Sequence, residues 1–320
     1  MEFLNAFTFA HGEKRGFTAG DEWKRSLDEL AAATGCDTLL LPVAARQEHA
    51  YSTQVDDDAP DVMSHEDARA VCAYARRKGM KLILKAMVNC RDGYWRAYIR
   101  FFDSYVPTEP TWEDWFQSYQ AYVWRLAELA QEVRAELFCV GCEMVGTDHR
   151  DAEWRRLVAG VRQRYDGPIT YNCDKFQEGN VSWWDALDVI SSSGYYPLSQ
   201  LPQHFERIRA VCERWQRPFL FMECGCPSRH GSEEVPNNWS FGGEQDNDAQ
   251  RRWYDAFTRQ VLSQSWVRGV GWWDWSATRL YPREQGATDR GYNVYGKPAE
   301  AVVRAFSQAL RERGEGPDKA

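Results

Sequence analysis

The sequence predicts an α/β protein that folds as a single (β/α)8 barrel, the TIM barrel, over residues 1–320. Short apolar, β-rich runs alternate with amphipathic helical stretches along the chain, which is typical of a parallel sheet. Eight such units can be counted, and they fit a chain of this length. The glycine-rich phosphate-binding turn of a doubly wound sheet is missing after the first strand.

The predicted strands are short apolar runs that end at turn or polar residues. In chain order they are Leu4–Phe9, Thr38–Val43, Lys81–Val88, Leu137–Cys142, Ile169–Asn172, Val189–Ser192, Phe219–Met222 and Gly269–Trp273. The predicted helices carry apolar residues at three- and four-residue spacing. They are Glu22–Thr34, His65–Lys78, Trp112–Arg134, Ala152–Tyr165, Trp183–Leu187, Gln203–Trp215, Ala249–Gln264 and Ala299–Glu312.

The composition of the chain argues against some classes of protein function. The formal charge of -8 argues against a nucleic-acid partner recruited by bulk positive charge. With 43% hydrophobic and 27% charged residues the chain lies in the globular range, which excludes disorder as its main state. Its 15 tryptophans are more than a core needs, so we expect some indoles to face a ligand.

The cellular setting is also an expectation from sequence. The N-terminus has neither a basic region nor a long apolar run, so we expect no secretory signal, no membrane span and a cytoplasmic location. Nine cysteines, an odd number in a large chain, indicate reduced thiols and not a disulfide framework. The oligomeric state is left open.

Two predicted strands end in a single carboxylate. Glu143 follows the fourth strand, and Glu223 follows the seventh. Because TIM-barrel chemistry sits at the carboxyl ends of the strands, we expect both side chains in the barrel mouth, facing each other. Glycoside hydrolysis needs one carboxyl group as acid and a second as nucleophile or base, roughly 5 to 9.5 Å apart. The alternative for either glutamate alone is a salt bridge to a neighbouring arginine.

Several segments together resemble glycoside hydrolase family 113 over nearly the whole chain. The segments are Trp112–Tyr119, Leu137–Glu143, Arg155–Arg156, Tyr165–Tyr171, Met222–Gly225 and Tyr295–Glu300. The resemblance implies a retaining enzyme acting on β-1,4-mannans, with Glu143 as acid/base and Glu223 as nucleophile. The wider clan usually has Asn before the acid/base, where it holds the sugar 2-hydroxyl, and this chain has Cys142. A glucoside, xyloside or galactoside therefore stays open as the substrate.

Aromatic residues at strand ends are candidates for substrate binding. Tyr195 and Tyr196 follow the sixth strand, where one phenol can hydrogen-bond the nucleophile while the other packs. The eighth strand ends in Trp272 and Trp273, and strand alternation lets only one of them face inward. We predict that Trp273 forms the floor of a sugar subsite. Further candidates for substrate contacts are Trp95, Cys142, Asn172 and Trp239.

Other chemistries are disfavoured. Cys139 and Cys142 point to opposite faces of a strand, so they cannot chelate one metal ion. The six histidines lack metal-binding spacing, and no nucleotide-binding or serine-hydrolase motif is present. We therefore expect no metal and no cofactor, and an oligosaccharide or glycoside as the partner. The competing function is a barrel that binds saccharides without cleaving them.

Overall fold

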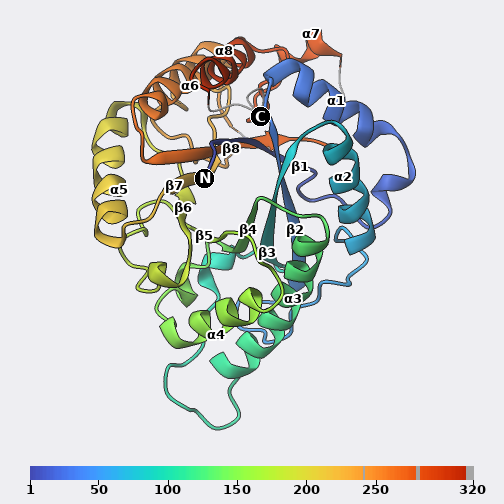
Figure 1. Cartoon of the computed structure of the whole chain (residues 1–320), viewed down its shortest axis with the longest axis vertical. Coiled ribbons are helices and arrows are strands. Elements are labelled where there is room, and N and C mark those ends of the chain that lie inside the picture. The colour runs from blue at the N-terminus through green and yellow to red at the C-terminus, as the bar shows by residue number, and fades with distance from the viewer. Residues whose placement is uncertain (241, 279–281, 315–320) are drawn as a thin grey trace. The chain divides into compact units, whose positions relative to one another are not determined.

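The computed structural model of the protein describes residues 1–240, 242–278 and 282–314. Eight strands form a closed barrel in the order β1-β2-β3-β4-β5-β6-β7-β8 (Figure 1). The pairs β3/β4, β4/β5, β7/β8 and β1/β8 are parallel. The strands are β1 (Leu4–Phe9), β2 (Thr38–Gln47), β3 (Lys81–Cys90), β4 (Leu137–Cys142), β5 (Ile169–Cys173), β6 (Val189–Ser193), β7 (Phe219–Cys224) and β8 (Val267–Trp275). Each predicted strand is confirmed, although six of them run further than expected.

Eight α-helices lie within the described residues. They are α1 (Glu22–Thr34), α2 (His65–Arg77), α3 (Trp112–Glu132), α4 (Asp151–Arg162), α5 (Leu201–Trp215), α6 (Asn247–Leu262), α7 (Arg283–Gly286) and α8 (Pro298–Glu312). The predicted helix over Trp183–Leu187 is wrong, because this segment holds only the 3-10 turn η4 (Trp184–Ala186). Both indoles are buried and donate to backbone oxygens of Asp148 and Glu178, which fixes a compact loop in place of a helix.

The described residues group into two compact units. The terminal unit consists of Met1–Phe9, Asp21–Leu39 and Ser192–Ala320, and the central unit consists of Ala10–Gly20 and Leu40–Ser191. None of the described helices is both long and apolar enough to cross a bilayer. All nine cysteines are buried and unbridged, as expected for a chain without a disulfide framework.

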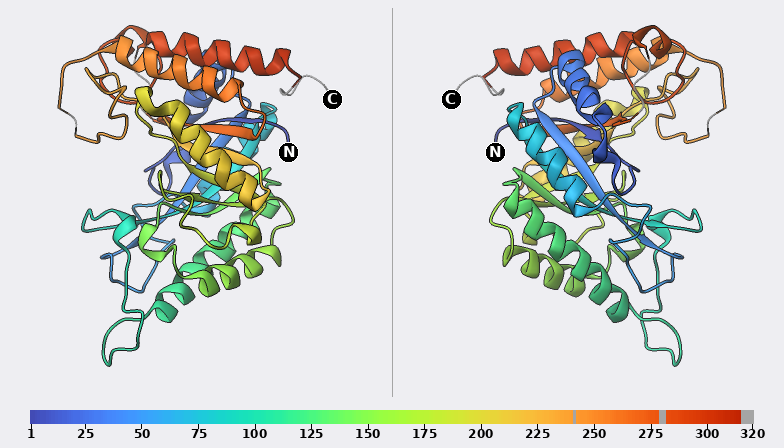
Figure 2. Two further views of the ribbon diagram at one scale, coloured as in Figure 1. Left: turned by 90° about the vertical axis from the view of Figure 1, so that its left-hand side faces the viewer. Right: turned by 90° about the vertical axis from the view of Figure 1, so that its right-hand side faces the viewer.

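An aromatic layer packs α3 and α4 against the sheet of the central unit. Trp115 stacks on Tyr119 with ring centroids 4.7 Å apart, and Trp154 stacks on Trp183 at 4.8 Å. Figures 1 and 2 show the two helices side by side. Their close approach depends on Gly160, where a Cβ atom would lie 2.3 Å from the Trp124 ring. Burial of these rings supplies much of the apolar area that stabilises this unit.

The terminal unit has its own core between β8 and the helices α6 and α8. Trp272 is fully buried against Tyr254, with ring centroids 5.2 Å apart, and against Phe306. Its indole N–H donates to Asn5 Oδ1 at 3.0 Å, while Asn5 Nδ2 donates to Ser307 Oγ at 2.7 Å. The buried Trp272 indole and Asn5 amide therefore both have hydrogen-bond partners, as buried polar groups usually do.

Candidate active site

Glu143 lies directly after β4 and is held by its backbone. Its φ angle of 52° is in the left-handed region, which is uncommon for a residue with a side chain. Its N–H donates to the carbonyl oxygen of Asn172 on β5 at 2.7 Å. The residue is largely buried. A strained and well-anchored backbone of this kind is typical of functional positions.

Two donors from the loop after β3 reach the Glu143 carboxylate. Oε2 accepts from the Trp95 indole at 3.3 Å and from Arg96 Nη1 at 3.2 Å. Arg96 is fixed in turn, since its Nε donates to Val88 O and its Nη2 to Asn89 Oδ1. The predicted contact candidate Trp95 is thus next to Glu143. Arg96 was not singled out, and it makes the salt bridge that we considered as the alternative role of this glutamate.

The β3 loop is docked tightly on the turn after Glu143. A Cβ atom at Gly146 would lie 2.3 Å from the Ile99 carbonyl oxygen, so only glycine fits there. This contact joins the turn η3 (Val145–Thr147) to the segment that carries Trp95 and Arg96. The position of both donors relative to Glu143 therefore depends on the absence of a side chain at one residue.

A buried hydrogen-bond network holds the backbone between Glu143 and this turn. The Tyr171 hydroxyl accepts from the N–H of Met144 at 3.0 Å and donates to Asp148 Oδ1 at 2.6 Å. Burial raises the pKa of Asp148 to about 7, with the nearby Asp174 adding to the rise while the Tyr171 hydrogen bond opposes it. The residue after Glu143 is therefore positioned by a carboxyl group that titrates near neutrality.

Glu223 lies one residue before the end of β7 and is almost fully buried. Its Oε2 accepts a hydrogen bond from the Tyr195 hydroxyl at 3.2 Å. This is the contact that we predicted for one of the two tyrosines after the sixth strand. A phenol that donates to a carboxylate favours the ionised form, which is the form a nucleophile requires.

An aromatic cluster surrounds the Tyr195 and Glu223 pair in the terminal unit. Trp239 contacts Tyr195 and Trp273 edge-on, with ring centroids 5.7 and 6.2 Å apart, and lies 4.7 Å from the Tyr292 ring. Tyr195, Trp239 and Trp273 are candidates that the sequence predicts, whereas Tyr292 was not predicted. The pKa of Tyr292 is raised well above its usual range, mainly by burial.

The remaining predicted contact residues have varied surroundings. Tyr196 is buried, stacks on His204 at 4.5 Å and accepts from Arg207 at 3.2 Å, so it packs against α5. Cys142 and Asn172 are buried neighbours, with the thiol 3.9 Å from Asn172 Oδ1. Their roles toward substrate stay predictions.

The distribution of tryptophan agrees with these two sites. Of the 15 indoles, Trp95 and Trp239 are the exposed ones, at 39% and 46%. Trp95 touches Glu143, and Trp239 belongs to the aromatic cluster next to Glu223. The others are buried or half-buried, so most of the excess tryptophan fills the core. Trp273 is half-buried, and its role as the floor of a sugar subsite stays a prediction.

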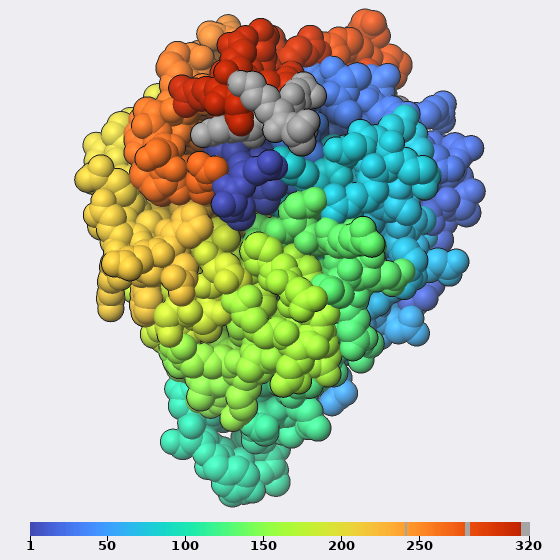
Figure 3. Space-filling view, in the orientation of Figure 1, coloured from blue at the N-terminus to red at the C-terminus, as the bar shows by residue number. Residues whose placement is uncertain are grey.

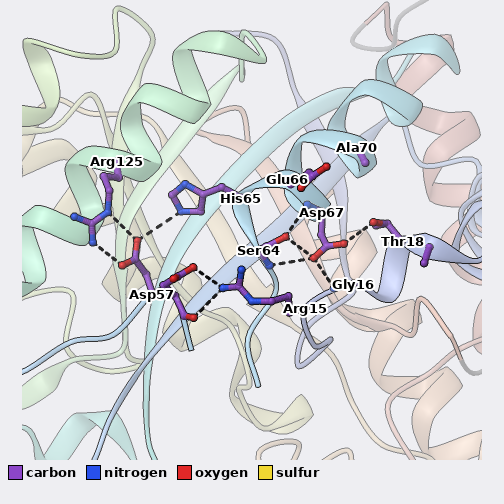
Figure 4. Close-up of a pocket in the computed structure, with 12 residues that line it drawn as sticks. Arg15, Gly16, Thr18, Asp57, Ser64, His65, Glu66, Asp67, Ala70 and Arg125 are labelled. Carbon is purple, nitrogen blue, oxygen red and sulfur yellow. Dashed lines mark hydrogen bonds and ion pairs between the residues drawn. The ribbon is translucent and has the colours of Figure 1, made fainter. Parts of the chain in front are cut away.

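A polar cavity of about 840 Å³ lies elsewhere in the central unit, between the loops after β1 and β2 and the helix α2 (Figure 4). Its two arginines are each paired with an aspartate. Arg125 binds Asp57 with two hydrogen bonds, and Arg15 binds Asp58 at 2.6 Å. Asp67 accepts from Gly16, Thr18 and Ser64. Burial alone would raise its pKa, but the bonds from Ser64, Thr18 and Gly16 outweigh this and lower it. These groups clamp the β1 loop to α2.

No group of three or more His, Cys, Asp or Glu side chains in the described residues could hold a metal ion.

Comparison with known proteins identifies the family. The model of glycoside hydrolase family 113 matches residues 7–297, which is most of the chain. The chain belongs to glycoside hydrolase family 113. A solved complex of a family 113 β-1,4-mannanase is 42% identical, with a TM-score of 0.94, and the match covers 97% of this chain and 100% of that one. The family assignment makes this protein a glycoside hydrolase and confirms the TIM barrel.

Two further solved structures are similar to the chain, one at high and one at low sequence identity. The family 113 β-mannanase AaManA from Alicyclobacillus acidocaldarius, solved in complex with ManMIm, is 38% identical with a TM-score of 0.91, covering 96% of this chain and 98% of that one. A β-glucuronidase from Ruminococcus gnavus is 14% identical with a TM-score of 0.61, covering 97% of this chain and 50% of that one, and it shares the fold alone. A search of curated protein sequences gave no match.

Proposed function

We propose that this family 113 enzyme hydrolyses β-1,4-mannosidic linkages of manno-oligosaccharides with retention of configuration. Glu223 is the nucleophile and Glu143 is the acid/base. The observation that carries the proposal is the pair of buried strand-end glutamates, each with its own donors. Glu223 accepts from a phenol, and Glu143 accepts from an indole and a guanidinium group. Two carboxyl groups in different settings are what a double displacement requires.

The donors suit the two steps of the reaction. In the first step Glu223 attacks the anomeric carbon while Glu143 gives its proton to the departing oxygen. The bond from Tyr195 favours an ionised and oriented Glu223 before the attack. Proton donation leaves Glu143 as a carboxylate, which Arg96 and Trp95 stabilise. In the second step this carboxylate takes a proton from the water that releases the sugar from Glu223.

The choice of sugar is supported by the relatives. The two similar family 113 enzymes are a β-1,4-mannanase and a β-mannanase, and both were solved as complexes. Cys142 stands where the wider clan usually has the asparagine that holds the 2-hydroxyl. Because mannose differs from glucose at that position, the test includes gluco- and xylo-oligosaccharides beside the manno-series.

The test compares several substrates and uses one variant. Wild-type enzyme is incubated with β-1,4-manno-oligosaccharides and the matching gluco- and xylo-oligosaccharides, and the first product anomer is followed by proton NMR. We expect cleavage of the manno-series with the β-anomer released first. Glu223→Ala should lose turnover, and azide should restore part of it on an aryl β-mannoside with an inverted product. Release of the α-anomer by the wild type, or no azide rescue, would contradict the assignment.

A further inference from the structure

We propose that a surface pocket in the central unit, formed by Tyr51 and the segment from Arg100 to Pro110, binds the distal sugars on the leaving-group side of the cleaved bond. The proposal rests on the proposed function, and it adds a second contact area for a long substrate. The pocket has a volume of about 630 Å³. Its walls come from the loop after β2 and from the loop between β3 and α3. The second loop projects from the surface of the molecule (Figure 3).

Exposed aromatic side chains are concentrated in the two loops that form this pocket. Ten large apolar side chains are exposed within the described chain, and six of them are Tyr51 or lie between residues 94 and 105. Tyr51 and Phe102, at 61% and 60% exposed, line the pocket itself. Concentrated exposed aromatics mark a binding surface, since isolated ones are scattered on ordinary surfaces. The apolar C–H faces of a pyranose fit such rings, because each ring offers a flat apolar face.

The charged groups at the pocket indicate a neutral and hydroxylated ligand. Arg100 and Glu109 both line it, and within the described chain neither side chain has a hydrogen-bond or ion-pair partner. A guanidinium and a carboxylate can respectively donate to and accept from sugar hydroxyls. Asp103 also lines the pocket, but Arg150, His149 and Trp112 already bond its carboxylate. The lining therefore has no excess of positive charge. A uronic acid or phosphate is therefore disfavoured against a neutral sugar.

The pocket is linked to Glu143 along the same loop. The Trp95 indole donates to Glu143, and the Trp95 ring contacts Tyr98 edge-on with centroids 6.1 Å apart. Arg100 follows Tyr98 by two residues, and its N–H donates to Ala50 O at 3.3 Å, next to Tyr51. The acid/base protonates the leaving oxygen, so the departing part of the substrate lies on its side of the cleaved bond. A long leaving group therefore extends from Trp95 along this loop to the pocket.

The experiment compares long and short leaving groups. We expect the double variant Tyr51→Ala with Phe102→Ala to lose about ten-fold in kcat/KM on the longest manno-oligosaccharides, mainly through KM, since an aromatic contact of this kind is worth roughly one factor of ten. An aryl β-mannoside, whose leaving group does not reach the pocket, should be cleaved within two-fold of wild type. Tyr105→Ala is the matched control, because this ring is 80% exposed on the same loop and does not line the pocket.

The outcomes separate this site from the proposed function. Equal losses on long and short substrates, or no loss on either, overturn the site. If the wild type cleaves none of the substrates, the proposed function fails and the site is judged by calorimetric titration with mannohexaose. Binding that the double variant weakens and Tyr105→Ala leaves unchanged then supports the site, and unaltered or absent binding refutes it. Thermal unfolding of each variant checks that it is folded.

Discussion

At the scale of single residues, the two tyrosines after β6 show how neighbouring side chains of one type take different roles. Tyr195 donates to Glu223, whereas Tyr196 packs on His204 and accepts from Arg207. Successive residues point in different directions, so the chain presents one phenol to the carboxylate and the other to α5. A hydrogen bond to a charged group contributes about 1.5 to 3 kcal/mol, which makes the first phenol the one to test.

Tyr195→Phe should lower kcat by roughly 10- to 100-fold, because Glu223 loses a donor that favours its ionised form. Without that donor the Glu223 carboxylate takes up a proton at higher pH, so the acidic limb of the kcat/KM profile should move upward. Tyr196→Phe is the control and should leave the profile in place. An acidic limb that stays in place in Tyr195→Phe, or that moves equally in both variants, would contradict the specific role of the Tyr195 hydroxyl.

Glu143→Ala tests the acid/base role at the same scale. Substrates with very good leaving groups need little help from an acid, so they should retain far more activity than substrates with poor leaving groups. The measurement is kcat/KM across a series of aryl β-mannosides of differing phenol pKa. Equal losses across the series would point to a structural role for the Glu143 and Arg96 ion pair.

At the scale of elements, the loop after β3 gives Glu143 its surroundings. This loop supplies both donors to the carboxylate and rests on the turn η3 at Gly146. In barrels of this kind, loops vary while the strands hold the ends that carry the chemistry. The strand therefore places the glutamate, and the neighbouring loop sets its electrostatic environment.

Gly146→Ala should reduce activity by at least ten-fold while the barrel stays folded. The new Cβ would lie 2.3 Å from Ile99 O, so the segment with Trp95 and Arg96 must move away from Glu143, and such misplacement costs on the order of 100-fold in rate. Gly179→Ala is the matched control, since nothing lies within 4 Å of its Cβ position. Activity in Gly146→Ala equal to that of the control would show that the loop contact does not position the donors.

At the scale of the whole molecule, buried titratable groups link stability to pH. The pKa of Asp148 rises to about 7 in the folded protein, mainly through burial. A raised folded pKa means that the folded state binds more protons than the unfolded chain between about pH 4 and 7. The contribution of this group to stability is therefore fully present at acidic pH and is lost as the pH rises through 7.

Asp148→Asn should remove the loss of stability at rising pH, because the amide resembles the protonated acid and its oxygen can still accept from Tyr171. Urea unfolding at pH 5 and pH 8 measures the effect. We expect the variant to gain about 1 to 3 kcal/mol relative to wild type on going from pH 5 to pH 8. If the variant and the wild type differ by the same free energy of unfolding at pH 5 and at pH 8, the raised pKa is contradicted.

The order of strands and the two strand-end glutamates could be read from the sequence, because periodicity and apolar runs report which residues are buried in regular elements. Glu143 and Glu223 were visible since each interrupts an apolar run at the end of a strand. Their catalytic roles remain predictions, as does the cytoplasmic location.

Only the tertiary structure decided which donors meet each carboxylate. Arg96 reaches Glu143 across 47 positions of sequence from an irregular loop, and Tyr292 joins the cluster of Trp239 from a segment with no periodic pattern. The choice between Tyr195 and Tyr196 likewise depended on side-chain directions after β6 ends. Local patterns record burial within an element, whereas contacts between loops arise only when the folded chain brings distant segments together.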